Sequence, residues 1–226
     1  MSVLRSILYY PVFYGISFFL VAGAAIASLI GPAALRRLVR MWTDWHRWCV
    51  VNILGMKVQV EGKVPEGAVL LAIKHESFFE AIDMPTLFDF PSVFAKRELF
   101  SIPMWGHSAI VYGLIPVSRD GGAKALRNMI TKARSMVDDN RPLVIFPEGT
   151  RVPHGERRPL QSGFAGLYKL LGMPVVPVAV NSGPLYHRLW KRSGTITYRF
   201  GEEIPAGLPR DEVEARVLDA MNALNE

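Results

Sequence analysis

The residues of this sequence best suited to catalysis begin with a histidine and a carboxylate spaced by five positions. His75 and Glu80 lie in the segment K-H-E-S-F-F-E, where an apolar run gives way to an amphipathic one. A neutral imidazole can accept a proton near pH 7, and a carboxylate bonded to its other ring nitrogen fixes the tautomer and stabilises the imidazolium. We therefore predict that His75 is a general base and Glu80 its orienting partner, with Glu76 and Asp83 as alternative partners.

The spacing also restricts where these two side chains sit on the backbone. On one continuous helix, side chains five residues apart point about 140° away from each other. His75 is therefore expected in the turn just before the helix that holds Glu80. Zinc chemistry is not expected, because H-E-x-x-H needs a second histidine where Phe79 stands.

The elements that must position these residues have the pattern of an α/β domain. Short apolar or β-branched runs predict strands, and segments with helical spacing of apolar residues separate several of them. This alternation predicts a mostly parallel central sheet flanked by helices, with ligands beyond the carboxyl ends of strands. Both His75 and Glu148 follow such a run. The predicted strands are residues 57–60, 68–73, 93–95, 143–146, 175–180 and 195–200, and the predicted helices are 125–137, 164–171 and 212–224.

An uncharged, apolar stretch precedes this domain. Residues 6–35 carry no charged side chain, and roughly 20 apolar helical residues suffice to cross a bilayer core. We predict a hydrophobic helical membrane anchor in residues 1–55 and a catalytic domain in residues 56–226. Arginines are more frequent after the stretch than before it, which favours a cytoplasmic location for the domain.

Two other interpretations of the N-terminus remain open. The small residues A-I-A at 25–27 resemble a signal-peptide cleavage site, although the apolar stretch is long and arginines follow it at once. Alternatively, Gly31-Pro32, together with Pro11 and two further glycines, can divide the stretch into two helices. Such helices would enter one leaflet without crossing the bilayer.

Composition narrows the chemistry further. A net charge of +6 and a pI near 9.6 favour an anionic partner, and the single cysteine, Cys49, excludes an intrachain disulfide and a thiolate metal cluster. The motifs G-x-S-x-G, G-x-x-x-x-G-K-[ST] and G-x-G-x-x-G are absent, so the usual evidence for serine hydrolases, P-loop enzymes and dinucleotide enzymes is missing. No metal and no resident cofactor are predicted. His46, His107, His154 and His187 have no motif partner and are interpreted as structural or surface residues.

Four ordered segments resemble those of the glycerolipid acyltransferase family, typified by the bacterial 1-acyl-glycerol-3-phosphate acyltransferases. The family's H-x-x-x-x-D block is matched from His75 to Glu80, with glutamate in place of the usual aspartate. The E-G-T-R block is matched in full at 148–151. Less specific similarities are G-L-I-P-V-S-R at 113–119, preceded by K-R-E-L at 96–99, and V-V-P-V-A-V at 175–180. The resemblance covers about residues 56–200.

The resemblance implies the glycerolipid acyltransferase fold and transfer of a fatty acyl group from an acyl-CoA or acyl-carrier-protein thioester. The expected acceptor is the free hydroxyl of lysophosphatidic acid, and the expected product is phosphatidic acid, made at the cytoplasmic face of a membrane. The partners are then the lysophospholipid, the acyl donor and the lipid bilayer, and not nucleic acid. Acylation of another lysolipid, such as a lyso-ornithine lipid, and lipid binding without turnover are the alternatives.

A phosphate on the acceptor requires fixed cations, and guanidinium suits it because it donates two parallel hydrogen bonds. Arg151 is the first candidate, and Gly149 would let the backbone approach the ligand closely. Some members of the set can alternatively form structural ion pairs at strand ends, namely Arg119, Lys96 and Glu148. The complete predicted phosphate-binding set is Arg151, Arg119, Lys96, Glu148, Gly149 and Thr150.

Overall fold

The computed structural model of the chain describes residues 1–118 and 122–225, so Arg119 lies outside the described residues. Within them, a seven-stranded sheet has the order β1-β7-β6-β2-β5-β3-β4. β6 and β7 are antiparallel, and the other neighbours are parallel. The predicted mostly parallel sheet is therefore confirmed. The strands are β1 (Lys57–Glu61), β2 (Leu70–Ile73), β3 (Ser92–Lys96), β4 (Ile115–Val117), β5 (Leu143–Ile145), β6 (Val175–Val180) and β7 (Thr195–Phe200).

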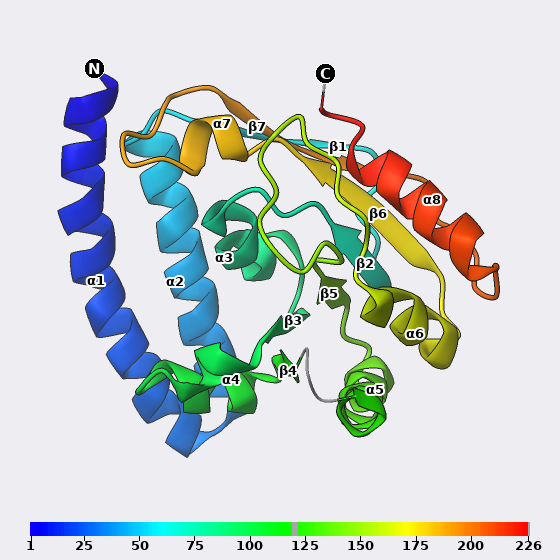
Figure 1. Cartoon of the computed structure of the whole chain (residues 1–226). Coiled ribbons are helices and arrows are strands. Elements are labelled where there is room, and N and C mark those ends of the chain that lie inside the picture. The colour runs from blue at the N-terminus through cyan, green and yellow to red at the C-terminus, as the bar shows by residue number, and fades with distance from the viewer. Residues whose placement is uncertain (119–121, 226) are drawn as a thin grey trace.

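Helices cover both faces of this sheet (Figure 1). The central strand β2 is buried on both faces, and its side chains alternate between two cores because successive residues of a strand point to opposite sides. Leu71 and Ile73 pack with α1, α2 and α3, whereas Leu70 and Ala72 pack with α5, α6 and α8. The helices are α1 (Ser2–Ile30), α2 (Pro32–Asn52), α3 (Phe78–Leu87), α4 (Trp105–Tyr112), α5 (Gly122–Asp138), α6 (Ser162–Leu171), α7 (Gly183–Tyr186) and α8 (Arg210–Met221), with a 3-10 turn at Arg97–Ser101.

The six predicted strands and three predicted helices all correspond to observed elements, with ends that differ by a few residues. The strand β4 and the helices α4 and α7 were not predicted. Both β4 and α7 are too short to show a periodic pattern, with three and four residues respectively.

Nearly the whole apolar stretch lies in one helix, α1, and the charged helix α2 that follows it turns back along α1. The break falls at Gly31, whose φ of 154° favours glycine, and Pro32 occupies the first turn of α2. Pro11 lies inside α1 without ending it. In the described part of the chain, α1 is the one helix that is long and apolar enough to cross a membrane by length and composition.

This helical hairpin packs against the sheet domain along the length of α1. Near its start, the Ser6 hydroxyl accepts a hydrogen bond from the Lys191 backbone, and Tyr9 is buried in the core. Near its end, Ala27 packs with Tyr112 of α4. The opposite face of α1 is exposed and carries large apolar side chains, including Leu4, Ile7, Leu8, Tyr14, Phe18, Phe19, Ile26 and Leu29.

Candidate active site

The predicted histidine and glutamate meet at the carboxyl end of β2. His75 follows this strand in a loop, and Glu80 lies in the first turn of α3, as the spacing predicts. His75 Nδ1 lies 3.0 Å from Glu80 Oε1. The imidazole stacks on Phe146, with ring centroids 4.4 Å apart, and its side chain keeps 16% exposure. The pairing leaves Nε2 of the imidazole available to a substrate.

A capping box explains why Glu80 points back toward His75. Ser77 is the N-cap of α3, and its hydroxyl accepts from the helix backbone while Glu80, at the third helical position, accepts from the N-cap backbone. Glu80 Oε1 accepts from the backbone N–H groups of Glu76 and Ser77, each at 2.6 Å. The same carboxylate therefore caps the N-terminus of α3 and holds the histidine.

The second oxygen of Glu80 faces two hydroxyl groups. Ser77 Oγ donates to Oε2 at 2.9 Å, and Ser182 Oγ donates to it at 2.6 Å. Complete burial raises the pKa of this carboxyl, but the hydrogen bond and charge attraction of His75, together with hydrogen bonds from Ser182 and Ser77, outweigh burial and hold the pKa below its ordinary value. Glu80 is thus a carboxylate at neutral pH.

The two alternative partners of His75 have other contacts. Asp83 is buried in an ion pair with Arg47 and accepts a hydrogen bond from the Tyr198 hydroxyl at 3.0 Å. Glu76 accepts from the Gly183 backbone at 2.8 Å. The geometry therefore assigns Glu80, and not Glu76 or Asp83, to His75.

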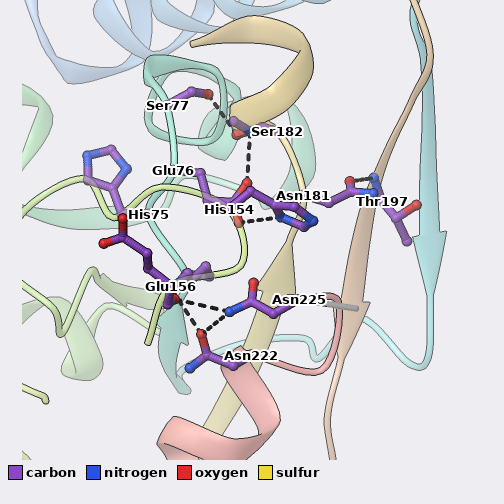
Figure 2. Close-up of polar contacts among 12 residues, drawn as sticks. His75, Glu76, Ser77, His154, Glu156, Asn181, Ser182, Thr197, Asn222 and Asn225 are labelled. Atoms are coloured by element: carbon purple, nitrogen blue, oxygen red, sulfur yellow. Dashed lines mark hydrogen bonds and ion pairs between the residues drawn. The ribbon is translucent and has the colours of Figure 1, made fainter. Parts of the chain in front are cut away.

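A second histidine–carboxylate pair, His154 and Glu76, lies near His75 (Figure 2). His154 Nδ1 is 2.9 Å from Glu76 Oε1, although no sequence motif linked these two residues. Burial raises the pKa of Glu76 despite the hydrogen bonds from Gly183 and His154. The pair fastens the loop after β5 to the loop after β2.

Glu148 does not line the cavity beside the histidine, contrary to the prediction that it belongs to the phosphate-binding set. Its carboxylate is fully buried and accepts from Lys74 Nζ at 2.7 Å. Lys74 also donates to the Asn222 side chain and the Glu156 carbonyl, each at 2.9 Å. Glu148 therefore forms a structural ion pair, the alternative given for it above. Through Lys74, this ion pair links the ends of β2 and β5 to Asn222 in the C-terminal segment.

Other members of the predicted set do line a large cavity that also contains His75. Arg151 and Thr150 reach it from the loop after β5, and Lys96 from the end of β3. The Arg151 guanidinium lies 4.2 Å above the Phe78 ring centroid, while the Lys96 side chain is 56% exposed and 3.7 Å from Glu98. Gly149 has a φ of 68°, which permits the turn that presents Arg151.

The cavity has a volume of about 1160 Å³, and most of its wall is apolar. Its wall extends from the histidine to the N-terminal hairpin and α4. The sequence did not indicate that α1 and α2 would form part of it. Apolar residues of these elements that line it are Leu20, Val21, Ala24, Leu38, Val39, Trp42, Trp105, Ala109 and Tyr112.

The sequence signal for Ser77 was present, because S-x-x-E at 77–80 is a capping-box pattern. Ser182 had no such signal, since it lies 102 residues from Glu80 in the chain. His46 is buried and contacts the Tyr186 hydroxyl at 2.9 Å, in keeping with its interpretation as a structural residue. Among residues 1–118 and 122–225, no three His, Cys, Asp or Glu side chains are grouped so that they could hold a metal ion.

A histidine–glutamate pair, a guanidinium and a largely apolar cavity thus lie together at the strand ends of an α/β sheet, where ligands bind in sheets of this kind. The sequence model of the family described as Acyltransferase matches residues 56–181, and the chain belongs to that family. This confirms the family resemblance.

Similar proteins agree with this assignment. The chain is 26% identical to the 1-acyl-sn-glycerol-3-phosphate acyltransferase of Pseudomonas aeruginosa over 86% of its own length and 76% of that protein. It is 31% identical to the Helicobacter pylori protein of the same name over 62% of its own length and 60% of that protein. The crystal structure of the 1-acyl-sn-glycerophosphate (LPA) acyltransferase PlsC from Thermotoga maritima superposes with a TM-score of 0.75 at 18% identity, covering 98% of this chain and 95% of that one. The predicted fold is thereby confirmed.

Proposed function

We propose that this protein transfers a fatty acyl group from a thioester to the free hydroxyl of lysophosphatidic acid and so forms phosphatidic acid. The observation that carries the proposal is the His75–Glu80 pair beside Arg151 in one apolar cavity. The names of the Pseudomonas and Helicobacter relatives support the same acceptor.

In this mechanism His75 acts as the general base. Its Nε2 accepts the proton of the acceptor hydroxyl while the hydroxyl oxygen attacks the thioester carbonyl carbon. Glu80 accepts the Nδ1–H bond, keeps the imidazole in the tautomer that leaves Nε2 unprotonated, and stabilises the imidazolium. When the tetrahedral intermediate collapses, the C–S bond breaks and the imidazolium returns its proton to the leaving thiolate.

Arg151 is the proposed anchor for the acceptor phosphate. Its guanidinium is held over the Phe78 ring, which fixes the planar group without using its N–H donors. Lys96, Thr150 and Gly149 line the same cavity and complete the proposed phosphate site, together with Arg119 outside the described residues. We propose no direct contact between Glu148 and the phosphate, since Lys74 binds its carboxylate.

The apolar part of the cavity is the proposed site for an acyl chain, because aliphatic and aromatic side chains from six helices, α1 to α6, and from the strands β3, β4 and β5 line it. The donor is proposed to be acyl-CoA or acyl-carrier protein, acting as a co-substrate. The reaction as written uses no resident cofactor.

We propose that the hairpin attaches the protein to the cytoplasmic face of a membrane by lying in one leaflet. The domain contacts α1 near both ends, at Ser6 and at Ala27, so a perpendicular α1 would pull the folded domain into the hydrocarbon. An α1 parallel to the surface instead buries its exposed apolar face in lipid. The arginines of α2 favour the cytoplasmic side.

The test is an assay of purified protein in mixed micelles with labelled acyl-CoA or acyl-carrier protein and a panel of lysolipids. We expect lysophosphatidic acid to be acylated fastest, and His75→Ala to lower kcat by about 10²–10⁴ with little change in lysolipid binding. Preference for a phosphate-free lysolipid would support the lyso-ornithine alternative. Binding of lysolipid without turnover by either donor would support the non-catalytic alternative and refute the proposal.

A further inference from the structure

Ser182 reaches the buried side of the histidine–glutamate pair from a distant part of the chain. It lies between β6 and α7 and is fully buried. Its hydroxyl donates to Glu80 Oε2 at 2.6 Å, although 102 residues separate the two positions. Ser182 is not part of the cavity wall, so its proposed effect on a reaction would pass through Glu80.

The two oxygens of Glu80 have different kinds of donor. Oε1 faces three N–H groups, from the His75 ring and from the backbones of Glu76 and Ser77. Oε2 faces the hydroxyls of Ser77 and Ser182, which also lie 2.7 Å from each other. Among the described residues, these two serines thus supply the hydrogen bonds to Oε2.

The two hydroxyls are not equivalent. Ser77 Oγ already accepts the Phe79 N–H of the helix cap at 3.0 Å, whereas each serine has one hydroxyl proton, which can go either to the other serine or to Glu80. Ser182 makes the shorter contact with Oε2. Ser182 therefore provides the hydroxyl whose main partner is the carboxylate.

The position of Ser182 is itself fixed by its neighbours (Figure 2). Asn181 accepts a hydrogen bond from the Thr197 backbone at 2.7 Å, and the Ser182 carbonyl accepts one from the Tyr186 backbone at 2.8 Å. At the end of α7, the Tyr186 hydroxyl contacts the Tyr9 hydroxyl and the His46 imidazole. These bonds hold the serine hydroxyl at a constant place beside the carboxylate.

We propose that Ser182 is a positioning residue that orients the Glu80 carboxylate toward His75. A glutamate has one more rotatable bond than an aspartate, and its terminal torsion is soft, so donors on one oxygen alone leave the carboxylate plane free to turn. The Ser182 hydroxyl makes the shorter of the two contacts that hold the other oxygen. This inference rests on the proposed function, in which Glu80 holds the base.

The first test measures the hydrogen bond without any substrate. Nitrogen-15 and proton NMR of the protein in micelles reports the tautomer of His75 and the exchange of its Nδ1 proton. We expect a slowly exchanging Nδ1–H in the wild-type protein and markedly faster exchange in Ser182→Ala. Unchanged exchange would overturn the inference. Because this measurement needs no turnover, it decides the role of Ser182 even if the proposed reaction fails.

The second test uses the proposed acyl transfer. Ser182→Ala is expected to lower kcat by about tenfold or more, the usual effect of losing a hydrogen bond to a charged group, while KM for both substrates stays within about twofold. In a Glu80→Gln background the same change should have an effect below about twofold, since the carboxylate it orients is gone. A full effect in that background, or wild-type kcat in the single variant, would overturn the inference.

Ser92→Ala is the matched control. Ser92 is another fully buried serine, whose hydroxyl donates to the Gly113 carbonyl and not to the site. Its kcat should match wild type even if the unfolding temperature falls. If Ser182→Ala does not fold, Ser182→Cys replaces it, because a thiol of similar size is a weak donor. We then expect a several-fold lower kcat and faster Nδ1–H exchange, and wild-type values for both would overturn the inference.

Discussion

Two substitutions at Glu80 can separate the effect of its charge on the proposed reaction from the effect of its side-chain length. Glu80→Gln keeps the length of the side chain. The amide oxygen can still accept from the His75 ring and from the two backbone N–H groups, while the amide nitrogen faces the hydroxyls of Ser77 and Ser182, which can accept. The variant therefore removes the charge and preserves the hydrogen-bonding geometry.

The size of the effect follows from the 3.0 Å contact between Nδ1 and Oε1. Unit charges centred about 4 Å apart attract by about 4 kcal/mol at an effective dielectric constant near 20. The amide dipole retains part of this attraction for the imidazolium. We therefore expect a loss of about 2–4 kcal/mol in the transition state, or a kcat roughly 30- to 1000-fold lower.

Glu80→Asp is the matched variant, because it keeps the charge and shortens the reach by about 1.5 Å. It must give up either the contact with His75 or the 2.6 Å contact with Ser182, and a lost bond to a charged group costs about 1.5–3 kcal/mol. Steady-state kinetics with lysophosphatidic acid measures both variants, with thermal unfolding as a control for folding. A glutamine variant with more than about a third of wild-type kcat would refute the charge-based role of Glu80.

Three further predictions concern the anion site and the buried polar groups. Arg151→Lys keeps the charge but loses the planar pair of donors, so KM for lysophosphatidic acid should rise about tenfold with a smaller change in kcat; an unchanged KM would remove Arg151 from the phosphate site. Lys74→Met leaves Glu148 buried without its cation, which should lower the free energy of unfolding by about 3–5 kcal/mol, and adding Glu148→Gln should restore a large part of it in denaturant titrations. Burial lowers the pKa of His46 to about 3, so the unfolded chain binds the extra proton between about pH 6.5 and pH 3 and acid removes stability in that window. From pH 6.5 to pH 5 this amounts to about 2 kcal/mol, and unfolding of His46→Phe should show a smaller fall over the same range; an equal fall would contradict this assignment.

The sequence alone determined the features that depend on residues close to one another along the chain. Hydrophobic runs located six strands, and the five-residue spacing placed His75 in the turn before the helix of Glu80. Both results are local, because the apolar pattern that marks a strand and the residues that cap a helix each lie within a few positions of the chain. The E-G-T-R block likewise marked the loop that presents Arg151.

Tertiary structure decided which of these local features meet. The strand β2 lies between β5 and β6, so the loops after three strands come together although they are far apart in sequence. That order brings Glu148 to Lys74 and Ser182 to Glu80. It also lets the N-terminal hairpin, an anchor by composition, form part of the cavity wall. Composition and periodicity report that a side chain is buried, but the order of strands and the packing of helices determine which partner it is buried against.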